Sequence, residues 1–298
     1  MPSAAHAQVV ALLRSLPRPV ASAENVQAIR AALDAIPTRA PRGVASHQTR
    51  APDRPAEWLV HEDSDPDVRL LYLHGGGFVA GSLHTHRALA GRIARAGRAA
   101  VLLVDYRLAP EHRYPAALED ALAALRHVRD HGPLGPGRAR RLFVAGDSAG
   151  GGLALATAVA LRDAGERWLD GVVTLSAWTD LSASGASIRA AAARDPMLDP
   201  ELLPVAARLY LGGVSPSTPL ASPLFADLVD LPPLLMQVGE HEILHDDTIR
   251  LMAKARRAGV DVETDIALDM FHVYQLFSMP ESREAIGRIG AWLRRRAA

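Results

Sequence analysis

From Glu57 onward, short apolar runs rich in Val, Leu and Ile alternate with longer Ala-rich stretches, and no other feature constrains the fold as strongly. This alternation is typical of α/β proteins, in which helices connect the strands of a sheet. Several runs are apolar without interruption, as in strands buried on both faces of a parallel sheet. We predict strands at 57–62, 69–73, 100–104, 141–145, 171–176, 234–238 and 261–266, and helices at 84–96, 116–130, 149–164, 246–258 and 281–296.

Two segments stand outside this alternation. Residues 1–45 predict one helix over 7–16 and a second helix that Ser22 caps. A long interval before the run at 234–238 contains a further predicted helix over 199–211. We expect these segments to form a small helical cap above the carboxyl ends of the strands, where open α/β sheets bind their ligands.

The composition excludes several classes of function. Lys plus Arg and Asp plus Glu both number 33, so no basic excess attracts nucleic acid or anionic lipid. Cysteine is absent, which excludes disulfides, thiolate metal sites and a cysteine nucleophile. The longest apolar run, 154–161, is far shorter than the roughly 20 residues of a membrane span, and the N-terminus lacks a signal-peptide pattern. We expect a soluble, cytoplasmic protein.

A nucleophile motif follows the strand predicted at 141–145. Gly146-Asp147-Ser148-Ala149-Gly150 matches G-x-S-x-G between a strand and a helix, which is the context that gives this pattern its meaning. Glycines beside the serine allow a strained turn that projects its hydroxyl, with the helix N-terminus facing a developing oxyanion. The alternative is that Ser148 only caps the helix.

A second glycine cluster, His74-Gly75-Gly76-Gly77-Phe78, follows an earlier strand and matches the HGGG pattern of lipases and esterases. Such glycines let backbone N–H groups approach a reacting carbonyl, and together with the N–H of Ala149 they would form an oxyanion hole. A competing interpretation is a nicotinamide dinucleotide loop. Gly75, Gly77 and Ala80 have the required spacing and Asp105 ends the next strand, but at about 28 residues instead of the usual 20 or so.

A serine nucleophile needs a histidine base and a carboxylate that orients it, and in α/β-hydrolases these follow in the order Ser, acid, His. His272 lies after the last predicted strand and is our choice of base among the twelve histidines. The acid should follow the strand at 234–238, where we choose Glu242 and keep Asp246 as the alternative. Acidic residues at the start of the next helix have an ordinary explanation in capping and the helix dipole.

The same segment contains a literal H-E-x-x-H, His241 to His245, the motif of zinc peptidases. A zinc site of this type needs both histidines on one face of a helix, whereas here the motif spans the exit of a strand and the entry of a helix. We therefore predict no metal site and keep a zinc hydrolase as a remote alternative.

These motifs make the chain similar to the hormone-sensitive-lipase-like group of α/β-hydrolases, which includes the bacterial family IV esterases. The resemblance covers most of the chain. It rests on HGGGF at 74–78, Asp105-Tyr106-Arg107-Leu108-Ala109-Pro110-Glu111, the GDSAGG segment, Ser176-Ala177-Trp178-Thr179-Asp180-Leu181 and Phe271-His272-Val273, all in the family order. The chain departs from the commonest pattern at the acid, where Glu242 stands in place of an aspartate.

The resemblance implies an α/β-hydrolase fold, with a mostly parallel central sheet flanked by helices and a small helical cap. It implies cap helices at 1–45 and a catalytic domain at 46–298 that carries a cap insertion at about 183–215. It also implies a serine carboxylesterase that needs no cofactor and acts on short- to medium-chain acyl esters. Ser148 would be the nucleophile and His272 the base, and Gly76, Gly77 and Ala149 would be the oxyanion donors.

Other properties remain open in the sequence. Phe78, Trp178 and Leu211 are candidate substrate-pocket residues, although ordinary core packing explains them as well. A lactone hydrolase or a deacetylase would use the same triad, and a non-enzymatic binding module is the alternative of a different class. The expected partner is a small-molecule ester, and a homodimer through the open edge of the last strand is a further expectation.

Overall fold

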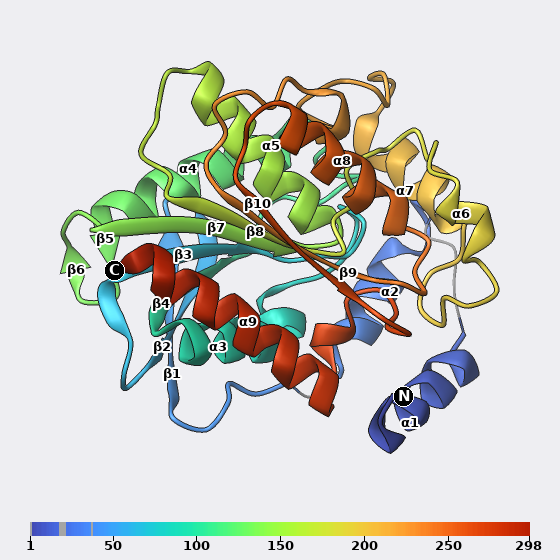
Figure 1. Ribbon diagram of the computed structural model, residues 1–298, viewed down its shortest axis with the longest axis horizontal. Helices are drawn as coiled ribbons and strands as arrows, with labels where there is room; N and C mark the ends of the chain where they lie inside the picture. The colour runs from blue at the N-terminus through green and yellow to red at the C-terminus, as the bar shows by residue number, and fades with distance from the viewer. Residues whose placement is uncertain (1, 18–21, 37) are drawn as a thin grey trace.

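An eight-stranded sheet forms the centre of the computed structural model, which describes residues 2–17, 22–36 and 38–298 (Figure 1). The strand order is β1-β2-β4-β3-β7-β8-β9-β10. The pairs β1–β2 and β2–β4 are antiparallel, and the other pairs of neighbouring strands are parallel. The strands are β1 (Val44–Ala51), β2 (Arg54–His61), β3 (Asp65–Leu73), β4 (Ala99–Val104), β7 (Arg141–Asp147), β8 (Gly171–Leu175), β9 (Leu234–Gly239) and β10 (Val262–Ala267).

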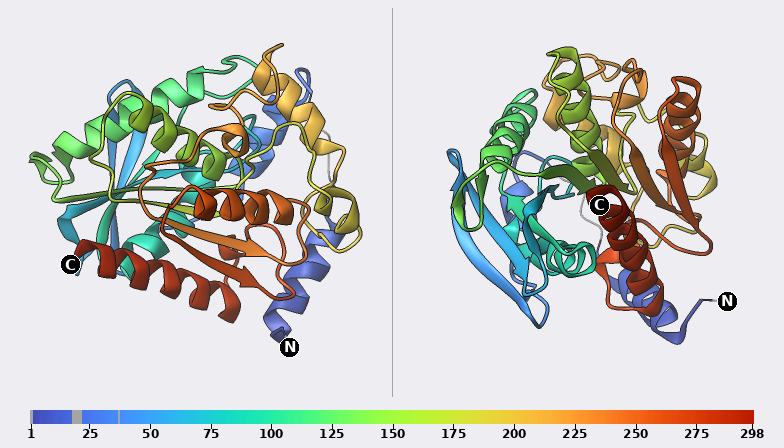
Figure 2. Two further views of the ribbon diagram at one scale, coloured as in Figure 1. Left: turned by 45° about the horizontal axis from the view of Figure 1, so that its top comes forward. Right: turned by 60° about the vertical axis from the view of Figure 1, so that its left-hand side comes forward.

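Helices cover both faces of the sheet. Alternate side chains of each strand point to opposite faces, so Leu70 and Tyr72 of β3 pack toward α3 (Leu83–Gly97) and α9 (Pro280–Ala297). Leu71 and Leu73 pack in the opposite core. That core contains side chains of α4 (Ala116–Asp130), α5 (Ala149–Asp163) and α8 (His245–Arg257). Figures 1 and 2 show the two helical layers on either side of the twisted sheet.

The remaining helices gather at the end of the sheet toward which the arrows of β9 and β10 point (Figures 1 and 2). They are α1 (Ala4–Ser15), α2 (Val26–Asp34), α6 (Ser187–Ala190) and α7 (Leu202–Leu211). Apolar side chains of α1 pack against a small core that contains Phe271. Arg30 of α2 donates to the carbonyls of Val79 and Ala109, at 2.7 Å each. The division into cap and catalytic domain stays a prediction.

The sequence-based elements agree with the structure, and the elements that were missed are a polar edge strand and a few short elements, among them α6. Every predicted strand and helix is present, but β1 (Val44–Ala51) was not predicted. It pairs with β2 along its whole length, yet only Ala51 among its residues is buried. A polar edge strand has no apolar pattern to reveal it. The short β5 (His131–Gly132) and β6 (Gly135–Pro136) pair was also not predicted.

Ser22 does not cap α2 as expected. Its hydroxyl oxygen accepts the amides of Glu24 and Asn25 within a turn, at 3.2 and 3.3 Å, and the helix begins only at Val26. Among the described residues, none of the helices combines the length and the apolar character that crossing a bilayer requires.

Candidate active site

Ser148 stands at a sharp turn between β7 and α5. Its φ of 52° and ψ of −122° lie outside the regions that L-residues ordinarily adopt. Its side chain makes no capping hydrogen bond to α5, so the interpretation of Ser148 as a simple helix cap is wrong. The turn is held by the Ser148 amide, which donates to the Leu175 carbonyl at 2.9 Å, and by its carbonyl, which accepts from Trp178 at 2.9 Å.

The glycines beside Ser148 are required by close backbone packing. A Cβ at Gly146 would lie 2.6 Å from the Leu73 carbonyl oxygen, and a Cβ at Gly150 would lie 2.1 Å from the same atom. Real Cβ atoms do not approach an oxygen this closely. The turn therefore lies directly against the end of β3, from which the second glycine cluster emerges.

The second glycine cluster forms a loop between β3 and α3. Gly76 and Gly77 have φ values of 121° and 63°, a conformation that glycine adopts without strain. Among the described residues, none accepts a hydrogen bond from the amides of Gly76, Gly77 or Ala149. A Cβ at Gly77 would contact the Ala206 side chain at 3.4 Å, so α7 lies over this loop. Unpaired amides of this kind are what an oxyanion hole needs.

Glu242 lies in the loop between β9 and α8 and is fully buried. One carboxylate oxygen accepts from the Ser176 hydroxyl at 2.7 Å and from the Gly239 amide at 3.0 Å. The other oxygen lies 3.5 Å from Nδ1 of His272. The carboxylate is thus fixed by two donors and directed at the imidazole.

His272 follows β10 and is 2% exposed. Burial lowers its pKa, but the hydrogen bond and charge of Glu242, with smaller contributions from Asp195 and Asp147, outweigh burial and raise the pKa above its ordinary value. No hydrogen bond joins His272 to Ser148 among the described residues. Such contacts are often long in enzymes without substrate and shorten in the complex.

Two residues support the acid and the base in ways that the sequence analysis missed. Ser176, at the end of β8, donates to Glu242 and accepts the amide of Val273 at 3.0 Å, so it joins the two loops. Asp195 accepts the amide of Ile243, the neighbour of Glu242, at 3.0 Å. Ser176 belongs to the segment that carries the family resemblance, but only its position in space reveals this contact.

The alternative acid faces elsewhere. Asp246 accepts the amide of Ser187 in α6 at 2.9 Å, and its neighbour Asp247 accepts the amides of Thr179 and Asp180. Burial raises the pKa of Asp247 to about 7. These contacts favour Glu242 over Asp246 as the partner of His272.

The H-E-x-x-H motif does not form one helical face. α8 begins only at His245, whose Nδ1 lies 3.0 Å from the Gly239 carbonyl oxygen. His241 instead approaches Glu240 and Asp269, at 3.8 and 3.9 Å. The geometry that a zinc peptidase motif needs is therefore not present.

The three candidate pocket residues are all buried, with exposures of 2% for Phe78, 1% for Trp178 and 5% for Leu211. Phe78 stacks on Tyr210 of α7 with ring centroids 3.8 Å apart and lies 6.2 Å from the Trp178 ring. An aromatic cluster thus adjoins the glycine loop. Whether these side chains contact substrate stays a prediction.

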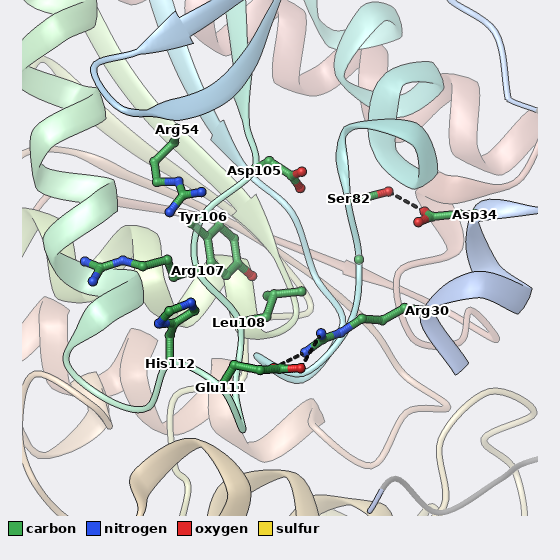
Figure 3. A pocket seen from close by; sticks show the side chains of 11 residues that line it. Arg30, Asp34, Arg54, Ser82, Asp105, Tyr106, Arg107, Leu108, Glu111 and His112 are labelled. Carbon is green, nitrogen blue, oxygen red and sulfur yellow. Dashed lines mark hydrogen bonds and ion pairs between the residues drawn. The ribbon is translucent and has the colours of Figure 1, made fainter. Parts of the chain in front are cut away.

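A separate cavity of about 360 Å³ lies beside α2, and its lining contains none of the three triad candidates (Figure 3). Figure 3 shows Arg54, Arg107 and His112 on one side, and Asp105, Ser82 and Asp34 on the other. Burial, with a contribution from Asp34, raises the pKa of Asp105 to about 6. This cavity is distinct from the turn that carries Ser148.

Comparison with known proteins identifies the family. The family model for the alpha/beta hydrolase fold matches residues 70–276. An acetyl-hydrolase of Streptomyces hygroscopicus is 46% identical over 241 residues, which are 80% of this chain and 79% of that protein. The chain belongs to the α/β-hydrolase family. The HGGG pattern of this family explains the glycine cluster, so the alternative of a dinucleotide-binding loop is not needed.

Solved structures place this α/β-hydrolase in a narrower group. An esterase of the bacterial hormone-sensitive lipase family is 41% identical, with a TM-score of 0.90 and coverage of 100% of both chains. EstE5, in crystals soaked with p-nitrophenyl butyrate, is 38% identical, with a TM-score of 0.92 and coverage of 99% of both chains. These comparisons confirm the resemblance to the hormone-sensitive-lipase-like group, the fold class and the prediction of a carboxylic ester hydrolase.

Proposed function

We propose that this protein is a serine esterase that hydrolyses short- to medium-chain acyl esters through an acyl-enzyme and without a cofactor. Ser148 is the nucleophile, His272 the general base, and Glu242 the carboxylate that orients His272. The amides of Gly76, Gly77 and Ala149 bind the oxyanion. The observation that carries the proposal is the strained turn at Ser148. It is supported by the contact between the buried Glu242 and His272 and by the loop amides, which have no acceptor among the described residues.

In the first half of the reaction, Oγ of Ser148 attacks the ester carbonyl while His272 takes its proton. The carbonyl oxygen becomes an oxyanion and receives hydrogen bonds from the loop amides and from Ala149. Each such donor contributes roughly 3 kcal/mol of transition-state stabilisation. Glu242 stabilises the imidazolium that forms, in keeping with its effect on the His272 pKa.

The tetrahedral intermediate then collapses: the bond between the carbonyl carbon and the alcohol oxygen breaks, His272 gives its proton to the leaving alcohol, and the acyl group remains on Ser148. A water molecule then attacks the acyl-enzyme, with His272 again acting as base. The carboxylic acid leaves and the Ser148 hydroxyl is restored. His272 carries every proton that is transferred, so the proposed reaction needs no cofactor.

The acyl-length preference rests on the aromatic cluster beside the glycine loop. Phe78 follows Gly77, stacks on Tyr210 at 3.8 Å and lies 6.2 Å from the Trp178 ring. We infer that these aromatic rings limit the space for a long acyl chain. The name of the acetyl-hydrolase relative refers to the acetyl group, which agrees with a short acyl chain. Acetylated substrates and lactones are therefore included among the compounds to be tested.

The proposal is tested with p-nitrophenyl esters of increasing acyl length, from acetate to palmitate, and with Ser148→Ala. We expect the highest kcat/KM between acetate and octanoate and no enzymatic turnover by the variant. A chelator is added to every assay to exclude a metal contribution. A maximum at palmitate would contradict the acyl-length proposal, and an active Ser148→Ala variant would contradict the nucleophile.

A further inference from the structure

A buried carboxylate directly precedes the nucleophile and is not used by the mechanism. Asp147 is 2% exposed and receives three donors. The Tyr72 hydroxyl donates to one of its oxygens at 2.8 Å, and the Gly75 amide donates to the same oxygen at 3.1 Å. Nε2 of His86 lies 3.2 Å from the other oxygen. One carboxylate therefore joins the end of β7, the start of the glycine loop and α3.

His86 is held between Thr85 and Asp147. The Thr85 hydroxyl donates its only proton to the Ser82 carbonyl at 3.0 Å, so its oxygen accepts from Nδ1 of His86 at 2.7 Å. Nε2 lies 3.2 Å from Oδ2 of Asp147 and 3.3 Å from the Gly75 amide nitrogen, so the imidazole contacts both the carboxylate and the loop. Burial tends to raise the pKa of Asp147, but the charge and hydrogen bond of His86 and the Tyr72 bond outweigh it and lower this pKa. Asp147, His86 and the Gly75 amide thus form one buried polar cluster.

The glycine loop is fitted around this carboxylate. A Cβ at Gly75 would lie 2.2 Å from Oδ2 of Asp147, so only glycine lets the loop approach it. On the neighbouring residue, the His74 carbonyl accepts from the Tyr106 hydroxyl at 2.7 Å. At the start of the glycine loop, Tyr106 thus holds His74 and Asp147 holds Gly75.

We propose that Asp147, in contact with His86, is a positioning residue that fixes the direction of the Gly76 and Gly77 amides relative to Ser148. In this role its carboxylate acts through the Gly75 amide, in addition to its small effect on the His272 pKa. Because Asp147 and Ser148 are adjacent, one short segment sets both the nucleophile and the oxyanion hole. The inference rests on the proposed function, in which these amides bind the oxyanion.

Asp147→Asn removes the charge of this side chain but keeps its shape. Three donors converge on two carboxylate oxygens, and an amide would offer one oxygen and place an NH2 group against an N–H or O–H donor. The Gly75 amide or His86 would lose its acceptor, and the loop would shift. The variant should therefore stabilise the transition state less well, because negative charge develops on the carbonyl oxygen there. Its affinity for the neutral ester should change much less.

The test compares Asp147→Asn with the wild type in two measurements. The first is kcat and KM for p-nitrophenyl butyrate. The second is the inhibition constant of a butyl trifluoromethyl ketone, which adds to a serine hydroxyl and places its oxyanion in the hole. We expect kcat/KM to fall about 10- to 100-fold with KM changed less than about threefold, and the ketone to bind more weakly by a similar factor.

Asp170→Asn is the matched control, because Asp170 also accepts a backbone amide of β7, that of Leu142 at 2.7 Å, but at the opposite end of the strand. It should leave kcat/KM and ketone affinity unchanged. His86→Gln keeps a donor toward Asp147 and should lose less activity than His86→Ala. If Asp147→Asn fails to fold, the comparison of His86→Gln with His86→Ala tests the proposal in its place.

Unchanged ketone affinity in folded Asp147→Asn, or equal losses in His86→Gln and His86→Ala, would overturn the positioning role. Loss confined to KM would overturn it as well. If instead the wild type is not inhibited by the ketone or Ser148→Ala is active, the proposed function itself fails. The two failures are therefore distinguishable.

Discussion

Three of the non-glycine residues with positive φ lie around the proposed triad. Ser148, Ser176 and Val273 have φ values of 52°, 51° and 44°, and Val273 directly follows His272. Each such residue costs on the order of 1–3 kcal/mol and persists only where the surroundings enforce it. Here the surroundings are the hydrogen bonds that Ser176 makes with Glu242 and with the Val273 amide. The strained residues are thus those that bring acid, base and nucleophile loops together.

The first prediction concerns Glu242→Gln. Glutamine keeps the shape but removes the charge that raises the His272 pKa, and burial, which lowers that pKa, remains. We expect the acid limb of the kcat/KM profile, where His272 becomes protonated, to move to lower pH. The plateau should fall on the order of 10³-fold or more but stay above the level of Ser148→Ala. The measurement is a pH–rate profile from pH 5 to 9.

Asp246→Asn is its control, since Asp246 contacts Ser187 and not His272. It should retain a profile close to that of the wild type. Wild-type activity in Glu242→Gln together with a large loss in Asp246→Asn would transfer the role of the acid to Asp246.

The second prediction concerns Ser176→Ala. Glu242 would keep the Gly239 amide but lose its hydroxyl donor, and the Val273 amide would lose its acceptor. We expect kcat to fall about 10-fold with a smaller change in KM. Ser282→Ala removes an equally buried hydroxyl, bonded to the Tyr274 carbonyl at 2.6 Å, and should cost stability without a comparable loss of kcat. Equal kcat losses in the two variants would contradict the role of Ser176.

At the residue scale, the sequence allowed candidates for the reacting residues to be proposed, but not the side chains that hold them in place. Ser148 and His272 could be selected because a G-x-S-x-G turn and the order of the triad restrict the choice. Ser176, Asp147 and Asp195 could not be assigned roles, because their partners are distant in the chain. No pattern in the sequence predicts which distant residue a buried serine or aspartate contacts.

At the scale of elements, the parallel strands place the site. Strands β3, β7, β8, β9 and β10 run in the same direction, so the loops after them meet at one edge of the sheet. The loops carry Gly76, Ser148, Ser176, Glu242 and His272 in turn. Continuous apolar runs made these strands predictable, whereas β1 escaped because its exposed, polar residues resemble a loop.

The third prediction concerns α7 and acyl length. Tyr210→Leu removes the ring that stacks on Phe78 and opens space next to the glycine loop. We expect the ratio of kcat/KM for octanoate to that for butyrate to rise several-fold, with a stability loss of about 1–3 kcal/mol. Activity is measured across the p-nitrophenyl ester series and stability by denaturant unfolding.

Phe143→Leu is the matched control. Phe143 is a fully buried aromatic residue that packs against Trp292 of α9, in the core on the other face of the sheet. It should lose similar stability but keep the wild-type acyl-length profile. The same shift in profile for both variants would show that the effect is general loosening and not the space beside Phe78.

At the scale of the whole molecule, β1 and β10 are the two edges of the sheet. Ile266 near the end of β10 is 42% exposed and Leu268 beyond it is 71% exposed. An unpaired edge with apolar side chains agrees with the expected homodimer, which stays a prediction. The cap function of α1, α2, α6 and α7 likewise rests on their position at the end of the sheet that carries the site.

The fourth prediction concerns stability in acid. Burial, with the charge of His86, lowers the pKa of His74 from 6.5 to about 3. Below pH 6.5 the unfolded chain binds a proton that folded His74 does not, so this residue makes the free energy of unfolding fall as pH falls toward 3. The slope is about 1.4 kcal/mol per pH unit. His74→Asn should therefore lose less stability than the wild type between pH 6.5 and 4.

Denaturant unfolding at several pH values measures this difference. Asp105 contributes with the opposite sign, because its raised pKa favours folding as pH falls, but it is present in both proteins and cancels. His47→Asn, at an exposed position on β1, should follow the wild-type curve. Parallel curves for His74→Asn and the wild type would contradict the account of a buried, neutral His74.

The central claim is that Ser148 carries the acyl group, and mass spectrometry of the protein after reaction with a p-nitrophenyl alkylphosphonate tests it most directly. The account predicts one phosphonyl group per chain, located by peptide mapping on Ser148, with activity lost in proportion to labelling. Ser148→Ala should remain unlabelled. A label on another residue, or full ester hydrolysis by a protein whose Ser148 is modified, would contradict the claim.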